Sequence, residues 1–162
     1  MSRAFTKESD GYEVTDRPDP AIPPGVPNHT TPAGAAAFRA RAGARIEERR
    51  ELQGTSGGLS GSRLLEVDAE IRWLESRIAT FVVTEPAVEP VRVGFGTRVT
   101  LTGDRERVVE IVGVDEVEAG SRRISWLSPL AKALHGHEVG DSGVLLTPVG
   151  EEEWEIVSIE AI

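Results

Sequence analysis

In the middle of the chain, apolar residues recur every three or four positions, which is the spacing of one helix face. They are Leu64, Val67, Ile71, Leu74, Ile78 and Phe81. A segment rich in Ala, Arg and Glu comes before them and starts at Thr31-Pro32, a pair that favours a helix start. Glycines separate the two segments, so the pattern predicts an antiparallel helical hairpin over residues 31–82.

After residue 90, the pattern changes from a helical period to the alternation typical of strands. Strand-like segments lie at residues 97–102, 107–112, 123–126, 143–147 and 153–159. Ser128-Pro129 is a helix-start pair, and Gly136 can end the short helix that follows. We therefore predict an α+β fold, in which residues 91–162 form an antiparallel sheet of about five strands crossed by one helix.

Two proline-containing segments flank the helical hairpin. Residues 1–30 contain Pro18, Pro20, Pro23, Pro24 and Pro27 among polar residues. Proline removes a backbone donor and fixes φ, so we predict a disordered N-terminal tail here. Residues 83–90 include two further prolines and are predicted to be a linker.

Charge and composition narrow the class of function. The net charge is −9, and residues 91–162 carry seven Lys and Arg against thirteen Asp and Glu. Affinity for phosphate backbones comes mainly from basic residues, so we expect a protein partner and no direct sequence-specific nucleic-acid binding. There is no cysteine and no apolar run of membrane-spanning length. We expect a cytoplasmic monomer without membrane contact.

Several motifs in the second half resemble those of the Gre family of bacterial transcription elongation factors. These are Phe95-Gly96-Thr97-Arg98-Val99, Ile111-Val112-Gly113 followed by Asp115-Glu116, Ile124-Ser125 with Ser128-Pro129-Leu130-Ala131, and Thr147-Pro148-Val149-Gly150 with Trp154-Glu155-Ile156. The resemblance implies a coiled-coil hairpin joined to an FKBP-like C-terminal domain. It also implies docking of that domain on RNA polymerase, at the rim of the secondary channel. The docking residues that it implies are Trp126, Leu127, Ser128, Pro129, Leu130 and Lys132.

The predicted hairpin tip departs from the Gre family. In Gre factors, acidic residues at the tip bind a Mg²⁺ ion, a hard cation that prefers oxygen ligands, and so promote transcript cleavage by the polymerase. Residues 53–63 here contain no Asp or Glu, and the nearest acids are Glu51 and Glu66. The tip residues are Thr55, Ser56, Gly57, Gly58, Leu59 and Ser60. We therefore predict no catalytic residue, no metal and no cofactor, and a polymerase regulator that does not stimulate cleavage.

Several alternatives stay open. The first helix has a basic side formed by Arg39, Arg41, Arg45, Arg49 and Arg50. It is either a solvated face or, with Arg45 and Arg49 foremost, a contact for channel walls or transcript. We interpret His29, His135 and His137 as surface residues and expect Trp126 and Trp154 in the core. The function itself could instead be that of an Rnk-like interaction module with another partner, or of a prolyl isomerase, for which the FKBP-like fold is the only support.

Overall fold

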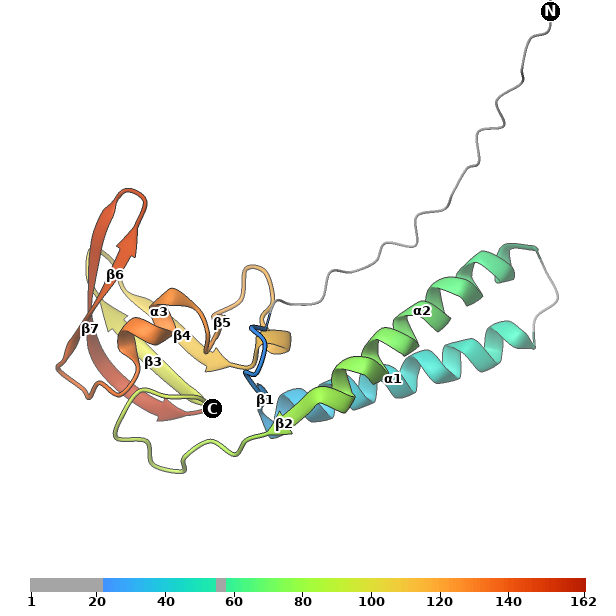
Figure 1. Cartoon of the computed structure of the whole chain (residues 1–162), viewed down its shortest axis with the longest axis horizontal. Helices are drawn as coiled ribbons and strands as arrows, with labels where there is room; N and C mark the ends of the chain where they lie inside the picture. The colour runs from blue at the N-terminus through green and yellow to red at the C-terminus, as the bar shows by residue number, and fades with distance from the viewer. Residues whose placement is uncertain (1–21, 55–57) are drawn as a thin grey trace, which may run out of the picture.

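The computed structural model describes residues 22–54 and 58–162. A two-helix hairpin extends from one side of a domain built on a five-stranded sheet (Figure 1). The fold class predicted from the sequence, α+β with an N-terminal helical hairpin, is confirmed.

The hairpin consists of α1 (Pro32–Gln53) and α2 (Gly58–Thr80). Thr31 caps α1 as expected, because its side chain accepts a hydrogen bond of 2.9 Å from the Gly34 N–H. The two helices pack through small residues on α1 and larger ones on α2. The buried members are Ala35 and Ala42 on α1 and Val67, Ile71 and Leu74 on α2.

A small parallel sheet closes the base of the hairpin. Strand β1 (Asn28–Thr30) pairs with β2 (Phe81–Val83), which follows α2 directly. The prediction of a disordered tail through residue 30 was therefore wrong for its last three residues, and Phe81 belongs to a strand rather than to the helix. The reason is tertiary: Asn28 and Thr30 are polar, but they are buried and hydrogen-bonded to acids more than 80 residues away.

The larger sheet has the strand order β5-β4-β3-β7-β6. Its strands are β3 (Thr97–Thr102), β4 (Arg107–Val112), β5 (Arg123–Ser125), β6 (Ser142–Thr147) and β7 (Gly150–Ala161). Strands β4 and β5 pair in parallel, so the sheet is mixed, and the prediction of an antiparallel sheet was wrong for this pair. The connection between them contains the 3₁₀ turn η1 (Val114–Glu116) and crosses over instead of folding back as a hairpin.

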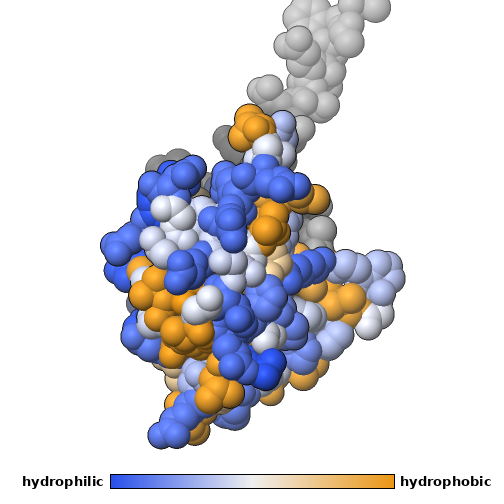
Figure 2. Space-filling view, turned by 90° about the vertical axis from the view of Figure 1, so that its left-hand side faces the viewer, coloured by the Kyte–Doolittle hydropathy of each residue, from blue (hydrophilic) through white to orange (hydrophobic). Residues whose placement is uncertain are grey.

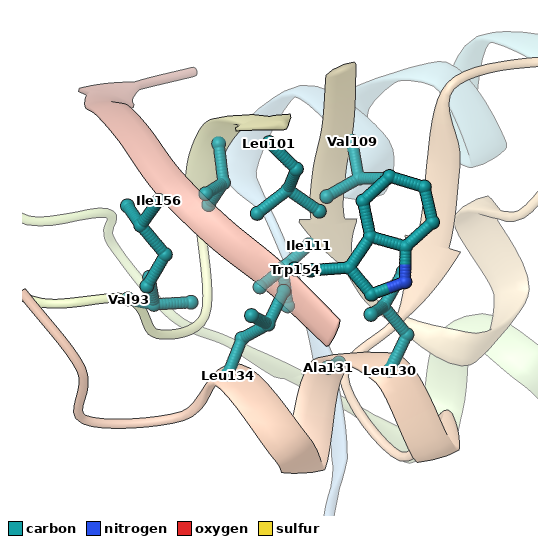
Figure 3. Close-up of a cluster of buried hydrophobic side chains, with 10 residues drawn as sticks. Val93, Leu101, Val109, Ile111, Leu130, Ala131, Leu134, Trp154 and Ile156 are labelled. Carbon is teal, nitrogen blue, oxygen red and sulfur yellow. The ribbon is translucent and has the colours of Figure 1, made fainter. Parts of the chain in front are cut away.

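Helix α3 (Pro129–Leu134) covers one face of this sheet and closes the main hydrophobic core (Figure 3). The core contains Val93, Val99, Leu101, Val109, Ile111, Leu130, Ala131, Leu134, Trp154 and Ile156. The prediction that Trp154 is a core residue is confirmed, whereas Trp126 is only half-buried and packs at the core's edge. Among the described residues, no helix combines the length and the apolar character needed to cross a membrane.

Candidate functional site

The segment between β5 and α3 is held by its own hydrogen bonds. The Trp126 N–H donates to the Val112 carbonyl at 3.0 Å, and the Ser128 N–H donates to the Ser125 carbonyl at 2.8 Å. Ser128 then caps α3, with its hydroxyl accepting from the Ala131 N–H at 3.2 Å. The sequence-based expectation of a helix start at Ser128-Pro129 is confirmed. The loop therefore presents its side chains in a fixed arrangement.

Five of the six predicted docking residues are at least partly exposed, and one is buried. Pro129 and Lys132 are exposed, and Trp126, Leu127 and Ser128 are half-buried beside them. Leu130 is only 5% exposed and packs into the core, so its assignment as a contact residue was wrong. The helical period explains this, because the position after Pro129 turns toward the sheet. The other five residues keep their predicted role, and we call them the docking surface: Trp126, Leu127, Ser128, Pro129 and Lys132.

A cavity of about 200 Å³ lies next to the docking surface, between the domain and the base of the hairpin. It is lined by His29, Thr84, Phe95, Ile111, Trp126, Ala131 and His135. His29 was interpreted as a surface residue, but it is half-buried, with its ring centroid 5.2 Å from that of Trp126 and 5.8 Å from that of Phe95. Its Nδ1 also lies 2.7 Å from the Thr84 hydroxyl. Sequence reasoning missed this cavity because its walls come from four separate segments.

Arg41, Arg45, Arg49 and Arg50 on the basic side of α1 form ion pairs within the hairpin. Arg45 lies 2.8 Å from Glu70 of α2 and 2.5 Å from Glu48 of its own helix. Arg49 lies 3.5 Å from Asp68, and Arg41 also pairs with Glu70. Arg41, Arg45 and Arg49 join the two helices. This side of α1 is therefore neither a purely solvated face nor a set of unpaired charges available for channel walls or transcript.

Glu48 is the centre of the ion-pair network near the tip. It accepts hydrogen bonds from Arg45 and from Arg63 of α2. These bonds, with Arg45 the larger cause, lower the pKa of Glu48 below its ordinary value. The same contacts raise the pKa of Arg63 above its ordinary value, with Glu48 the larger cause and Glu66 second. Arg63 is exposed and Glu48 is half-buried, so salt still screens part of their attraction.

The tip itself is only partly described. Thr55, Ser56 and Gly57 lie outside the described residues, as do the side chains of Gly58, Leu59 and Ser60. Of the two nearest acids, Glu66 pairs with Arg63 at 3.0 Å. Within residues 22–54 and 58–162, no group of three or more His, Asp or Glu side chains is placed to hold a metal ion.

Comparison with known proteins gives matches concentrated in the C-terminal half. Residues 88–161 match the family described as "Transcription elongation factor, GreA/GreB, C-term". Transcription elongation factor GreB of Neisseria meningitidis serogroup B is 44% identical over 104 residues, which cover 62% of this chain and 64% of that protein. Transcription elongation factor GreA of Pseudomonas putida is 39% identical over 101 residues, or 59% of this chain and 63% of that protein. The chain thus spans less than two thirds of the length of these curated relatives.

One match among solved structures covers most of the chain. The crystal structure of Thermus aquaticus Gfh1 is 25% identical and covers 83% of this chain and 99% of that chain, with a TM-score of 0.41. The sequence matches, together with the sheet and helix α3 described above, define a C-terminal domain of the transcription elongation factor class. Residues 88–161 are therefore similar to the C-terminal domain of the GreA/GreB family.

Proposed function

We propose that this protein regulates transcription by binding RNA polymerase at the secondary channel without stimulating transcript cleavage. The C-terminal domain supplies the binding through the docking surface, and the hairpin occupies the channel. In this role the protein competes with factors that do stimulate cleavage.

The observation that carries the proposal is the contrast between the C-terminal domain and the segment at the hairpin tip. Residues 88–161 match the GreA/GreB C-terminal family, so the domain that docks in Gre factors is present. Residues 53–63 contain no Asp or Glu, so the segment lacks the carboxylate ligands with which the tip of a Gre factor binds Mg²⁺. Neutral hydroxyls and glycine cannot replace the negative charges of those carboxylates around a hard cation.

Binding is tested with purified RNA polymerase and matched charge reversals. Lys132→Glu changes the docking surface, whereas Arg105→Glu reverses an exposed charge in the turn between β3 and β4. We expect Lys132→Glu to weaken retention of the protein on immobilised polymerase at least tenfold and Arg105→Glu to leave it unchanged. Absence of binding by the wild-type protein would contradict the proposal.

Cleavage is tested on backtracked elongation complexes. We expect no added cleavage of the transcript by this protein alone, and slower cleavage when it is added in excess over a cleavage-stimulating Gre factor. Strong cleavage by this protein alone would refute the proposal. In that case Glu51→Gln and Glu66→Gln would show whether either of these acids reaches the polymerase metal.

We also propose that the protein is not an enzyme, and one structural observation bears on the prolyl-isomerase alternative. Phe95 and Trp126 line the 200 Å³ cavity, but His29 and Thr84 of the hairpin base form part of its wall. The hairpin base thus takes up room beside the aromatic rings. We expect no acceleration of cis–trans isomerisation in a proline-containing peptide, and measurable acceleration would revive this alternative.

A further inference from the structure

Two adjacent acids of the C-terminal domain reach across to the base of the hairpin. They are Asp115 and Glu116 in the 3₁₀ turn η1, and we call them the junction acids. Asp115 accepts two hydrogen bonds from the Arg77 guanidinium of α2, at 2.9 and 2.8 Å. It also accepts one of 2.8 Å from the Asn28 side chain of β1. The side chains of Arg77 and Asp115 are only 9% and 2% exposed, so water screens this bidentate pair weakly.

Glu116 holds the other helix. One of its carboxylate oxygens accepts hydrogen bonds from the Thr31 N–H at 2.8 Å, the Thr30 hydroxyl at 3.1 Å and the Gly113 N–H at 3.0 Å. The second oxygen accepts from the Thr31 hydroxyl at 2.5 Å. Thr31 is the N-cap of α1, so this buried carboxylate binds the residue from which the first helix starts.

The close approach of the C-terminal domain to the base of the hairpin depends on two glycines. A Cβ atom at Gly34 would lie 2.1 Å from the Oε2 atom of Glu116, and a Cβ at Gly113 would lie 2.3 Å from the His29 carbonyl oxygen. No side chain tolerates such distances without a shift of its neighbours. The sequence therefore leaves room for the Glu116 carboxylate against the first turn of α1.

The covalent connection alone would not orient the hairpin. Residues 84–96 join β2 to β3 and contain neither helix nor strand. A hairpin held by one contact could pivot about it, whereas contacts to both helices fix its direction. Asp115 supplies the contact to α2 and Glu116 supplies the contact to α1.

We infer that Asp115 and Glu116 are positioning residues, which set the direction of the hairpin relative to the docking surface before any partner binds. This inference rests on the proposed function for its purpose, since a hairpin that must enter a channel after the domain docks needs a defined direction. Its structural part concerns the free protein and is testable without polymerase.

The absence of native cysteine makes the test direct, because two introduced cysteines can carry the only spin labels. Leu65 on α2 and Val157 on β7 are suitable sites, since they are 66% and 50% exposed. Double electron–electron resonance on the full chain should give one narrow distance distribution. We expect Asp115→Asn with Glu116→Gln to widen it at least twofold, and the exposed Glu118→Gln to leave it unchanged.

A distribution that stays narrow in the folded double variant would overturn the inference. If the double variant does not fold, Gly34→Ala decides the question, because it displaces the Glu116 carboxylate without removing a polar group. Gly43→Ala in the same helix is its control, since a Cβ there meets nothing within 4 Å. A width for Gly34→Ala equal to that of Gly43→Ala would equally refute the inference.

Binding and competition experiments with RNA polymerase separate this inference from the proposed function. We expect the Asp115→Asn, Glu116→Gln variant to stay bound to immobilised polymerase within about threefold of wild type, because the docking surface is unchanged. Its competition with a cleavage-stimulating factor should fall at least tenfold. Failure of the wild-type protein to bind polymerase would remove the proposed function but leave the spin-label result standing. Full competition by a variant with a widened distribution would contradict the positioning role.

Discussion

The two glycines of helix α1 should respond in opposite ways to the same substitution. Alanine in a helix interior is favoured over glycine by about 0.5 to 1 kcal/mol. At Gly43 nothing lies within 4 Å of the added methyl group, so we expect Gly43→Ala to raise the free energy of unfolding by about this amount. At Gly34 the methyl group would lie 2.1 to 2.7 Å from three atoms of the Glu116 side chain, which would have to move.

The cost at Gly34 follows from what the Glu116 carboxylate would lose. It accepts four hydrogen bonds in a buried site, from Thr30, Thr31 twice and Gly113. A hydrogen bond to a charged group contributes about 1.5 to 3 kcal/mol, so loss of two of the four would cost about 3 to 6 kcal/mol. After the helix gain is subtracted, we expect Gly34→Ala to lower the free energy of unfolding by about 2 to 5 kcal/mol.

Urea unfolding measures both effects. Far-ultraviolet circular dichroism reports the helices and tryptophan fluorescence reports the packing, and coincident transitions would support a two-state fit. The key quantity is the difference between the two variants, because both carry the same chemical change in the same helix. If Gly34→Ala is as stable as Gly43→Ala, the carboxylate contacts do not stabilise the junction and the reasoning is wrong.

Three further outcomes are expected. Arg77→Met would leave Asp115 as a buried charge without its bidentate partner, and should lower the free energy of unfolding by about 3 to 5 kcal/mol. The double variant Arg77→Met, Asp115→Asn should lose less. Equal losses in the two variants would argue against an ion-pair effect. Because the pKa of Glu48 is lowered by Arg45 and Arg63, its contribution is complete above the ordinary value of 4.5 and is lost as pH falls below it. The urea midpoint of Glu48→Gln should therefore lie below that of wild type near neutral pH and converge with it in acid, and a gap that does not depend on pH would contradict this cause. Ser128→Ala removes the N-cap of α3 and should cost about 1 kcal/mol. The control in the same thermal unfolding experiment is Ser142→Ala, at an exposed serine where β6 begins.

Local periodicity predicted much of the fold. Strands β3 and β4 lie at residues 97–102 and 107–112, as the alternation indicated, and α1 begins at the Thr31-Pro32 pair. Each of these elements has a signal within its own segment: alternation for a half-buried strand, or a cap and a proline for a helix start. The sequence was therefore sufficient wherever the cause of the structure is local.

The features that the sequence did not predict depend on tertiary contacts. Strand β1 has the sequence Asn28-His29-Thr30, which has no apolar alternation, and its burial depends on acids of a distant turn. Arg45 and Arg49 were recognised as basic, but their pairing with acids of α2 depends on the register between two helices. No period of either helix alone reveals that register.

The contacts along the hairpin bear on how its two parts would share the work under the proposed function. The buried apolar residues are Ala35 and Ala42 on α1 and Val67, Ile71 and Leu74 on α2, so none is described close to the tip. Beyond Ala42, ion pairs such as Arg63 with Glu48 join the helices, and such exposed pairs are weak and screened by salt. Arg41, Arg45, Arg49 and Arg63 of the hairpin are already paired with acids, which reduces their attraction for nucleic acid. Under the proposed function, the affinity for polymerase would then come mainly from the docking surface. The hairpin would act by occupying space in the direction that the junction acids set.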